Sequence, residues 1–271
     1  MNRKYTANWL FGIIAILALT GTIWVAKPVA QVSSKLPEPI TINVSAALGL
    51  KDVLQEIQKE YEVSNKNVKI VFNFGPAGVL QKQLEQGVPA DLFISASLKQ
   101  VNELQNKNLV VPSSRKILVS DKLVLVVPKN SQSPITNFQD LKTVTKFGIG
   151  ELGTVPAGQY ALESLKSIGI WEDVKDRAVQ AKDVRTIIAY VETGNVDAGI
   201  AFSTVAALSD KVKVVAVASE GSHTPVNFPA VIMANSQHPQ ETEALLEYLC
   251  GSQSAEIFKK YGFNFVGAGV K

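Results

Sequence analysis

Short runs of β-branched residues alternate with amphipathic stretches along most of the chain, and this alternation is what most constrains its fold. Between Leu50 and Tyr61, for example, apolar residues recur every three or four positions, which predicts a helix with one buried face. Alternating strands and helices predict an α/β fold with mostly parallel, helix-covered sheets. The predicted strands are 41–44, 68–74, 92–95, 118–127, 146–149, 198–201, 212–217 and 230–233, and the predicted helices are 50–61, 78–86, 158–167, 184–192, 241–250 and 254–261.

The chain of 271 residues is long enough for two modest α/β domains, each with its own core. The long apolar run 116–129 is a candidate crossing from one domain to the other, and 228–234 is a candidate return. These crossings predict a first lobe of residues 38–121 plus 232–271 and a second lobe of residues 122–231. Two hinge crossings would let the lobes close around a ligand.

The first 30 residues have the order of an export signal. Arg3 and Lys4 form a short basic region, and residues 9–26 follow without a charge. The small residues up to Ala30 suit cleavage after that position, which predicts a periplasmic or otherwise extracytoplasmic protein. An apolar run of this length can also barely span a bilayer. Residues 1–30 are therefore either a signal peptide or an N-terminal membrane anchor, and a membrane-tethered receptor stays open.

The distribution of charge argues against a nucleic-acid partner. The whole chain carries 27 basic and 24 acidic residues, but three of the basic ones, Arg3, Lys4 and Lys27, lie in the export segment. The remaining 24 basic and 24 acidic residues balance. The mature domain therefore has no basic excess with which to bind a polyanion.

Four turns between predicted strands and helices are built largely from small residues and are candidate ligand contacts. They span residues 44–52, 73–80, 153–160 and 181–186, two in each predicted lobe. In parallel α/β sheets, ligands bind beyond the carboxyl ends of strands, where helix N-termini offer unpaired N–H groups and a positive dipole end. Tight-turn geometry explains any one of these turns by itself. The set of four predicts a small anion held between the lobes.

The same stretches carry a family resemblance. Residues 44–52, 75–96, 155–158, 183–185 and 255–263 resemble, in this order, the periplasmic molybdate-binding proteins of molybdate ABC transporters. The resemblance implies a type II periplasmic binding protein fold with two α/β lobes and two hinge crossings. It also implies that a monomeric protein without a cofactor captures a small oxyanion, molybdate or tungstate, in the interlobe cleft. The closed form would then be presented to an ABC transporter permease in the membrane.

The sequence departs from this family at the oxyanion site. The family adds hydroxyls of two serines and a tyrosine to its backbone N–H donors, and those three positions are here Gly49, Ala77 and Phe202. Four backbone donors and one apolar wall are then expected at the ligand: Gly49, Ala77, Ala157 and Val184 as donors, and Phe202 as the wall. Four hydroxyl side chains are near enough in sequence to act as substitutes: Ser45, Thr154, Ser203 and Thr204.

The missing hydroxyls leave two outcomes open. A hydrogen bond to a charged group contributes about 1.5–3 kcal/mol, so three losses would weaken binding by roughly three to six decades if they were additive. Either the protein still binds molybdate or tungstate through backbone donors alone, or its drier cleft is retuned to another, less charged small solute. Arg185 and Lys51 lie one or two residues into the helices that follow two of the turns, and they either add charge to the site or are solvated.

An enzyme is the competing class, and the sequence argues against it. Residues 148–153 match the dinucleotide pattern G-x-G-x-x-G, but residues 154–156 separate them from the next helix. His223 and His238 lie in polar segments, and no G-x-S-x-G nucleophile motif occurs. Two distant histidines and one cysteine make neither a catalytic triad nor a zinc site. No covalent chemistry and no bound metal are therefore expected.

Overall fold

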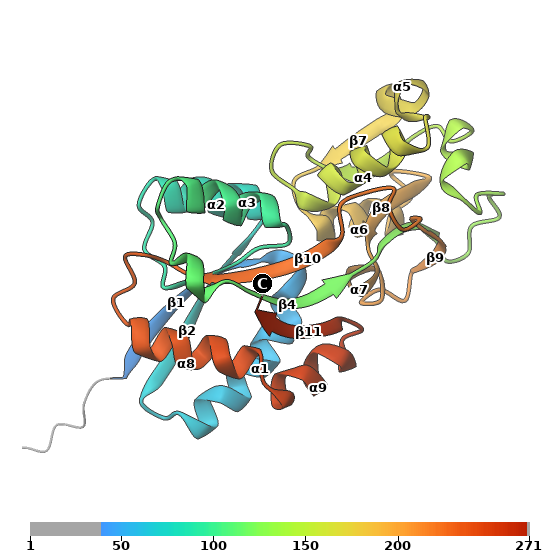
Figure 1. Cartoon of the computed structure of the whole chain (residues 1–271). Helices are drawn as coiled ribbons and strands as arrows, with labels where there is room; N and C mark the ends of the chain where they lie inside the picture. Colours follow the sequence, from blue (N-terminus) through green and yellow to red (C-terminus); the bar gives the residue numbers. More distant parts are fainter. Residues whose placement is uncertain (1–38, 270–271) are drawn as a thin grey trace, which may run out of the picture. The chain divides into compact units, whose positions relative to one another are not determined.

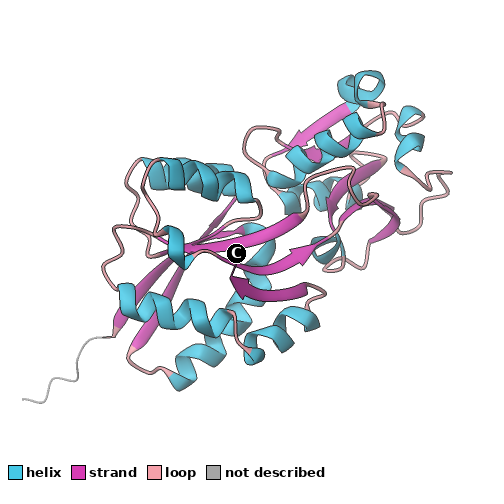
Figure 2. Cartoon of the chain, in the orientation of Figure 1, coloured by secondary structure: helices cyan, strands magenta, loops and turns pink. Residues whose placement is uncertain are grey.

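Two sheets organise the part of the chain that the structure describes, residues 39–269 of a computed structural model. One sheet has six strands in the order β11-β4-β10-β3-β1-β2, and the other has five in the order β7-β6-β8-β5-β9. Figure 2 shows both sheets with the helices that cover them. We call the six-stranded sheet with its helices the first lobe, and the five-stranded sheet with its helices the second lobe.

The strands are β1 (Ile40–Ala47), β2 (Val68–Gly75), β3 (Leu92–Ile94), β4 (Lys116–Asp121), β5 (Leu123–Pro128), β6 (Phe147–Gly150), β7 (Ala178–Ala181), β8 (Ala198–Phe202), β9 (Val212–Val217), β10 (Val226–Ile232) and β11 (Asn264–Gly269). The α-helices are α1 (Lys51–Ser64), α2 (Ala77–Glu85), α3 (Leu98–Asn106), α4 (Pro156–Ser167), α5 (Trp171–Val174), α6 (Val184–Glu192), α7 (Ser203–Ala206), α8 (Pro239–Leu249) and α9 (Ser252–Lys260). Short 3-10 helices are η1 (Leu48–Leu50), η2 (Pro112–Ser114), η3 (Phe138–Lys142) and η4 (Lys175–Arg177).

The prediction of an α/β fold is confirmed, but both sheets are mixed and not mostly parallel. In the first lobe β1 runs parallel to β2 and β3, whereas β10 is antiparallel to β3 and β4. In the second lobe β6 runs parallel to β7 and β8, whereas β5 is antiparallel to β8 and β9. The antiparallel strands are those next to the crossings between lobes, where the chain reverses its direction through the molecule.

The helices are amphipathic, as the apolar spacing of the sequence predicts. In α1 the buried side chains are Val53, Leu54, Ile57 and Tyr61, which share one face. Burying such a side chain contributes about 1.5–3 kcal/mol, so this face fixes the helix on the sheet. In Figure 1, α2 and α3 lie on one side of the first sheet, and α1, α8 and α9 on the other. In the second lobe α4 and α6 both pack on β6 and β8.

The chain passes between the lobes twice. Strand β4 ends at Asp121 in the first sheet, and β5 begins at Leu123 in the second, so the predicted single strand 118–127 is two strands. The return runs from β9 in the second sheet to β10 in the first. Strand β10 begins at Val226, four residues before the predicted strand 230–233. The two crossings lie side by side, because Val226 pairs with Asp121.

Other predicted elements differ mainly at their ends. Helix α6 has the predicted bounds, and α4 begins at Pro156 instead of residue 158 because proline suits the first helical turn. The sequence did not predict α3, α5, α7, β7 or β11. No helix within residues 39–269 has both the length and the apolar character needed to cross a bilayer. The export segment, residues 1–30, lies outside the described residues.

Candidate ligand site

Turns from both lobes meet at one small cavity, which we call the turn cavity. Its volume is about 20 Å³, and its lining comprises Ala47, Leu48, Gly49, Gly75, Pro76, Ala77, Ala96, Val155, Pro156, Ala157, Asp183, Val184 and Phe202. The structure therefore brings together all five residues predicted to contact the ligand. They come from the ends of β1, β2, β6, β7 and β8 and from the helices that follow. Their contact with a ligand stays a prediction.

Most of these residues lie where a helix begins. Ala77 and Val184 are the first residues of α2 and α6, Ala157 is the second residue of α4, and Gly49 lies in η1, directly before α1. N–H groups in a first turn have no carbonyl acceptor within their own helix. They also lie at the positive end of the helix dipole, which favours a negative charge nearby.

The helix starts differ in whether the protein itself caps them. At α6 the Asp183 carboxylate accepts a hydrogen bond from the Thr186 N–H at 2.8 Å. Within residues 39–269, by contrast, the N-cap residues of η1, α2 and α4 make no side-chain capping hydrogen bond. Uncapped first turns in a partly enclosed place leave donors for another acceptor. Besides Asp183, which is occupied by its own helix, the described lining offers only apolar side chains and backbone.

The four hydroxyl side chains proposed as substitutes are absent from the described lining of the turn cavity. Thr154 donates its hydroxyl hydrogen bond to Glu151 at 2.5 Å. The hydroxyls of Ser203 and Thr204 both donate to Asp121, each at 2.5 Å. Ser45 is buried within β1. These four side chains therefore do not place a hydroxyl at the turn cavity.

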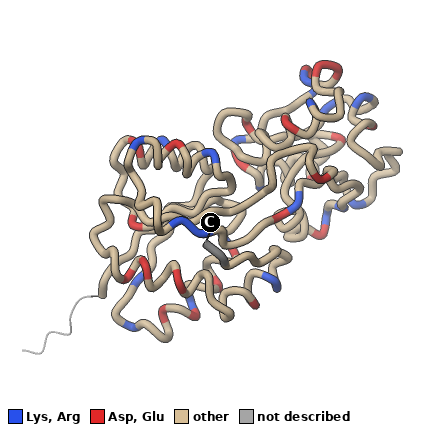
Figure 3. The backbone as a smooth tube through the Cα atoms, viewed as in Figure 1, with Lys and Arg blue, Asp and Glu red and all other residues tan. Residues whose placement is uncertain are grey.

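The charged groups behind the turns are not simply solvated. Arg185, in the first turn of α6, donates to the Asp52 carboxylate of α1 and weakly, at 3.4 Å, to the Leu48 carbonyl. The pair joins the two lobes, since α6 belongs to the second and α1 to the first. The positive charge of Arg185 is thus matched by Asp52 beside the turn cavity. Elsewhere basic and acidic positions are interspersed over both lobes (Figure 3).

Tyr160 is a residue near the cavity that the sequence did not predict. Its side chain is buried in α4, and its hydroxyl donates to the carbonyl of Ala96, a lining residue of the other lobe, at 3.2 Å. Its ring lies 6.2 Å from that of Phe202 between centroids. Burial raises the pKa of Tyr160 to about 12, so the hydroxyl keeps its proton and remains a donor. The only sequence signal was its place on the apolar stripe of α4.

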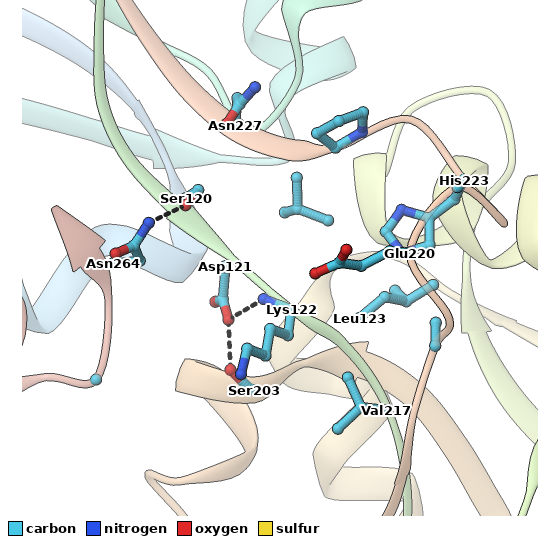
Figure 4. Close-up of a pocket in the computed structure, with 15 residues that line it drawn as sticks. Ser120, Asp121, Lys122, Leu123, Ser203, Val217, Glu220, His223, Asn227 and Asn264 are labelled. Atoms are coloured by element: carbon cyan, nitrogen blue, oxygen red, sulfur yellow. Dashed lines mark hydrogen bonds between the residues drawn. The ribbon is translucent and has the colours of Figure 1, made fainter. Parts of the chain in front are cut away.

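A second, larger cavity of about 670 Å³ lies at the crossings between the lobes (Figure 4). Asp121 lines it and accepts hydrogen bonds from Ser203, Thr204 and the Lys122 N–H, the last at 2.6 Å. Burial raises the pKa of the Asp121 carboxyl, although these hydrogen bonds act in the opposite direction. Through these hydrogen bonds the Asp121 carboxyl joins the end of β4 to the start of α7, which follows directly after Phe202. It thus fixes the crossing strand to the strand that carries a lining residue.

Two α/β lobes with two crossings and with helix starts gathered at a cavity define a class of protein that binds a small ligand between lobes. Residues 42–264 match the family described as bacterial extracellular solute-binding proteins. The chain belongs to this family. Because members of this family bind solutes and are not enzymes, the prediction that the chain is not an enzyme is confirmed.

Individual relatives agree with this assignment. The chain is 41% identical to the putative ABC transporter substrate-binding lipoprotein YvgL of Bacillus subtilis, over 97% of this chain and 99% of the relative. It is 36% identical to the molybdate-binding protein ModA of Haemophilus influenzae, over 82% and 89%. Among solved structures, the substrate-binding domain of a putative molybdenum ABC transporter from Clostridium difficile superposes with a TM-score of 0.68 at 37% identity, covering 84% and 99%. The prediction of a type II periplasmic binding protein fold is thereby confirmed.

Proposed function

We propose that the protein is the extracytoplasmic solute-binding component of an ABC importer, and that it captures molybdate or tungstate at the turn cavity through backbone N–H groups. The names of its relatives support the role: YvgL is a putative ABC transporter substrate-binding lipoprotein, and ModA is a molybdate-binding protein. The proposed donors are the N–H groups of Gly49, Ala77, Ala157 and Val184, and Phe202 is the apolar wall.

The observation that carries this proposal is the meeting of helix starts from both lobes at one cavity. Each helix start places about half an elementary charge there, positive in sign, together with unpaired donors. A hydrogen bond to a charged acceptor contributes about 1.5–3 kcal/mol, so four donors supply about 6–12 kcal/mol of gross binding energy, which is comparable with the cost of association. A dianion that accepts several hydrogen bonds and donates none suits such a lining.

A second candidate is favoured by the apolar side chains of the lining. Leu48, Val155, Val184 and Phe202 offer no hydroxyl to an oxyanion, and a cavity of this kind also suits a smaller or less charged solute. The difference between the two candidates lies in how many oxygens the ligand presents to the helix starts.

Calorimetric titration of residues 31–271 separates the candidates. Molybdate and tungstate are titrated in parallel with sulfate and phosphate. Binding of molybdate or tungstate without sulfate would support the proposal. Absence of heat with all four anions would contradict it and favour the second candidate, to be tested next with less charged solutes.

We further propose that the two lobes move about the crossings, with β10 moving as part of the first lobe because it pairs with β3 and β4. Ligand binding should then compact the molecule, and small-angle scattering without compaction at saturating molybdate would count against closure. The protein is proposed to act as a monomer that presents its closed form to the permease of the importer.

Export is the remaining part of the proposed role. The relative YvgL is a lipoprotein by name, whereas residues 1–30 here predict either a cleaved signal or an anchor at residues 9–26. Mass spectrometry of the mature N-terminus distinguishes the two. A terminus near residue 31 would indicate a free carrier, and an intact N-terminus would indicate a tethered receptor.

A further inference from the structure

We propose that Arg185 is a positioning residue that holds the two lobes together beside the turn cavity and orients one of its backbone donors. The inference rests on the proposed function for its effect on a ligand, but its effect on the lobes is independent of any ligand. It is carried by two contacts of the same guanidinium group, one to the Asp52 carboxylate and one to the Leu48 carbonyl.

The first contact joins the lobes. Arg185 lies one residue after Val184, and Asp52 lies three residues after Gly49, so the ion pair spans the lobes next to two lining residues. The side chains are 32% and 36% exposed, so solvent screens the pair only in part. Two other cross-lobe contacts near the cavity, from Gly78 to Thr154 and from Tyr160 to Ala96, have neutral partners. The Arg185–Asp52 pair therefore makes this set of contacts sensitive to salt.

The second contact orients a peptide plane. The Leu48 carbonyl accepts from the Lys51 N–H as well as from Arg185, so its direction is fixed from two sides. In a trans peptide the carbonyl and the following N–H point in opposite directions. The Gly49 N–H, one of the proposed donors, must then point away from Arg185. An arginine can donate to a carbonyl while paired to a carboxylate, because its guanidinium carries several donors in a rigid plane.

This arrangement also explains why Arg185 need not contact the anion. Its charge is matched by Asp52, so the lining keeps helix starts as its source of positive potential. The arginine acts on binding through lobe closure and through the Leu48–Gly49 peptide.

The test measures lobe separation without ligand. Two spin labels are placed at exposed positions, Lys59→Cys in α1 and Lys166→Cys in α4, in a Cys250→Ala background of the mature chain. Pulsed dipolar spectroscopy then gives the fraction of molecules with the lobes in contact. Arg185→Gln should lower the ratio of contacting to separated molecules about 1.5- to fivefold, the range expected of a partly exposed ion pair. High salt should lower it in the parent protein but not in Asp52→Asn.

Lys182→Gln is the matched control. Lys182 is exposed in the same turn and makes no ion pair within residues 39–269. The substitution therefore removes the same positive charge as Arg185→Gln but leaves the Arg185–Asp52 ion pair in place. The double variant Asp52→Asn/Arg185→Gln should lose no more than Arg185→Gln alone, because the two groups share one interaction. Molybdate dissociation, followed by stopped flow, should accelerate in Arg185→Gln by a similar factor.

The outcomes are distinguishable. Equal contact fractions in Arg185→Gln and Lys182→Gln would overturn the proposal, and so would a parent protein with no detectable fraction in contact. Failure of molybdate to bind any variant would contradict the proposed ligand, while the distance measurement would still decide the role of Arg185.

Discussion

The backbone N–H of Gly78 donates to the carbonyl of Thr154 at 2.9 Å, so the first turn of α2 touches the turn before α4 directly. A Cβ atom at Gly78 would lie 2.7 Å from the Thr154 Cα and 2.9 Å from its carbonyl oxygen. Both are backbone atoms and cannot rotate away. The close approach of the two lobes at this point therefore depends on the absence of a side chain.

Gly78→Ala should prevent this approach without unfolding either lobe. The overlap with backbone costs about 1–3 kcal/mol, so the Kd for molybdate should rise roughly 5- to 150-fold. The melting temperature should stay the same or rise, because alanine is favoured over glycine inside a helix. Gly153→Ala, where a Cβ meets nothing within 4 Å, is the matched control. Equal Kd values in the two variants would contradict the prediction.

Restoring a hydroxyl at the turn cavity should strengthen oxyanion binding. A Cβ at Gly49 would lie 3.5 Å from Val205 and 3.8 Å from Val184, which is ordinary contact, so Gly49→Ser should be accommodated. One hydrogen bond to the anion lowers the Kd for molybdate by about 10- to 150-fold. Gly49→Ala separates the hydroxyl from the added carbon. A serine variant that binds no better than the alanine variant would place the ligand away from Gly49.

Ala77→Ser and Phe202→Tyr test the other two positions in the same way. Ala77 opens α2 and Phe202 precedes α7, so each new hydroxyl would approach the cavity from a different lobe. Calorimetric titration should show the double variant binding molybdate more tightly than either single variant. A gain from Ala77→Ser alone would indicate that the ligand lies against the first lobe.

Tyr160→Phe should weaken ligand binding more than it weakens the fold. It removes the hydrogen bond to the Ala96 carbonyl and leaves that carbonyl without its partner. The expected cost is about 1–3 kcal/mol, felt when the lobes are in contact. Molybdate titration and thermal unfolding of the same variant measure the two effects. A large fall in melting temperature with unchanged affinity would assign Tyr160 to the fold alone.

Asp121 should make stability depend on pH in a defined direction. Its pKa is raised in the folded state above the ordinary value of 3.8, so the folded protein binds the proton more tightly than the unfolded chain. The contribution of Asp121 to stability therefore falls as pH rises from about 4 through its folded pKa, and is constant above it. Asp121→Asn should lack this decline in urea unfolding measured across the range. Identical pH profiles would show that Asp121 titrates normally.

Removing the Asp121 carboxyl group should destabilise the fold more than neutralising its charge. Asp121→Ala leaves the hydroxyls of Ser203 and Thr204 without their acceptor, at a cost of about 1–3 kcal/mol each. Asn keeps one acceptor oxygen, so Asp121→Asn should retain most of the stability at neutral pH. Equal losses in the two variants would mean that the hydrogen bonds contribute little.

The features that the sequence predicted correctly are those determined by residues close together in the chain. The turns that carry Ala77, Ala157 and Val184 were found because a strand, small residues and a helix start follow one another within a few positions. The bounds of α6 follow from Asp183, whose carboxylate caps it, and from its apolar spacing. The polar residues 120–122 interrupt the apolar run 116–129 and agree with the predicted lobe boundary at residues 121 and 122, although the predicted strand 118–127 ran through them and is in fact β4 and β5.

The contacts that the sequence did not predict join residues far apart in the chain. Arg185 and Asp52 are separated by 133 positions, Ser203 and Asp121 by 82, and Tyr160 and Ala96 by 64. No local pattern relates such partners, since their approach depends on how two sheets share two crossings. Arg185 and Asp52 also have an ordinary local explanation as solvated charges, and Tyr160 has one as part of an apolar stripe.

The uncapped helix starts around the turn cavity have a consequence for how such a protein diversifies. Every amino acid except proline carries a backbone N–H, so substitutions can accumulate at these positions over many generations without abolishing the donors. Side chains that discriminate one solute from another carry no such protection. A lineage can therefore exchange its specificity while its general attraction for anions is inherited intact, and only proline at a donor position itself would interrupt that inheritance.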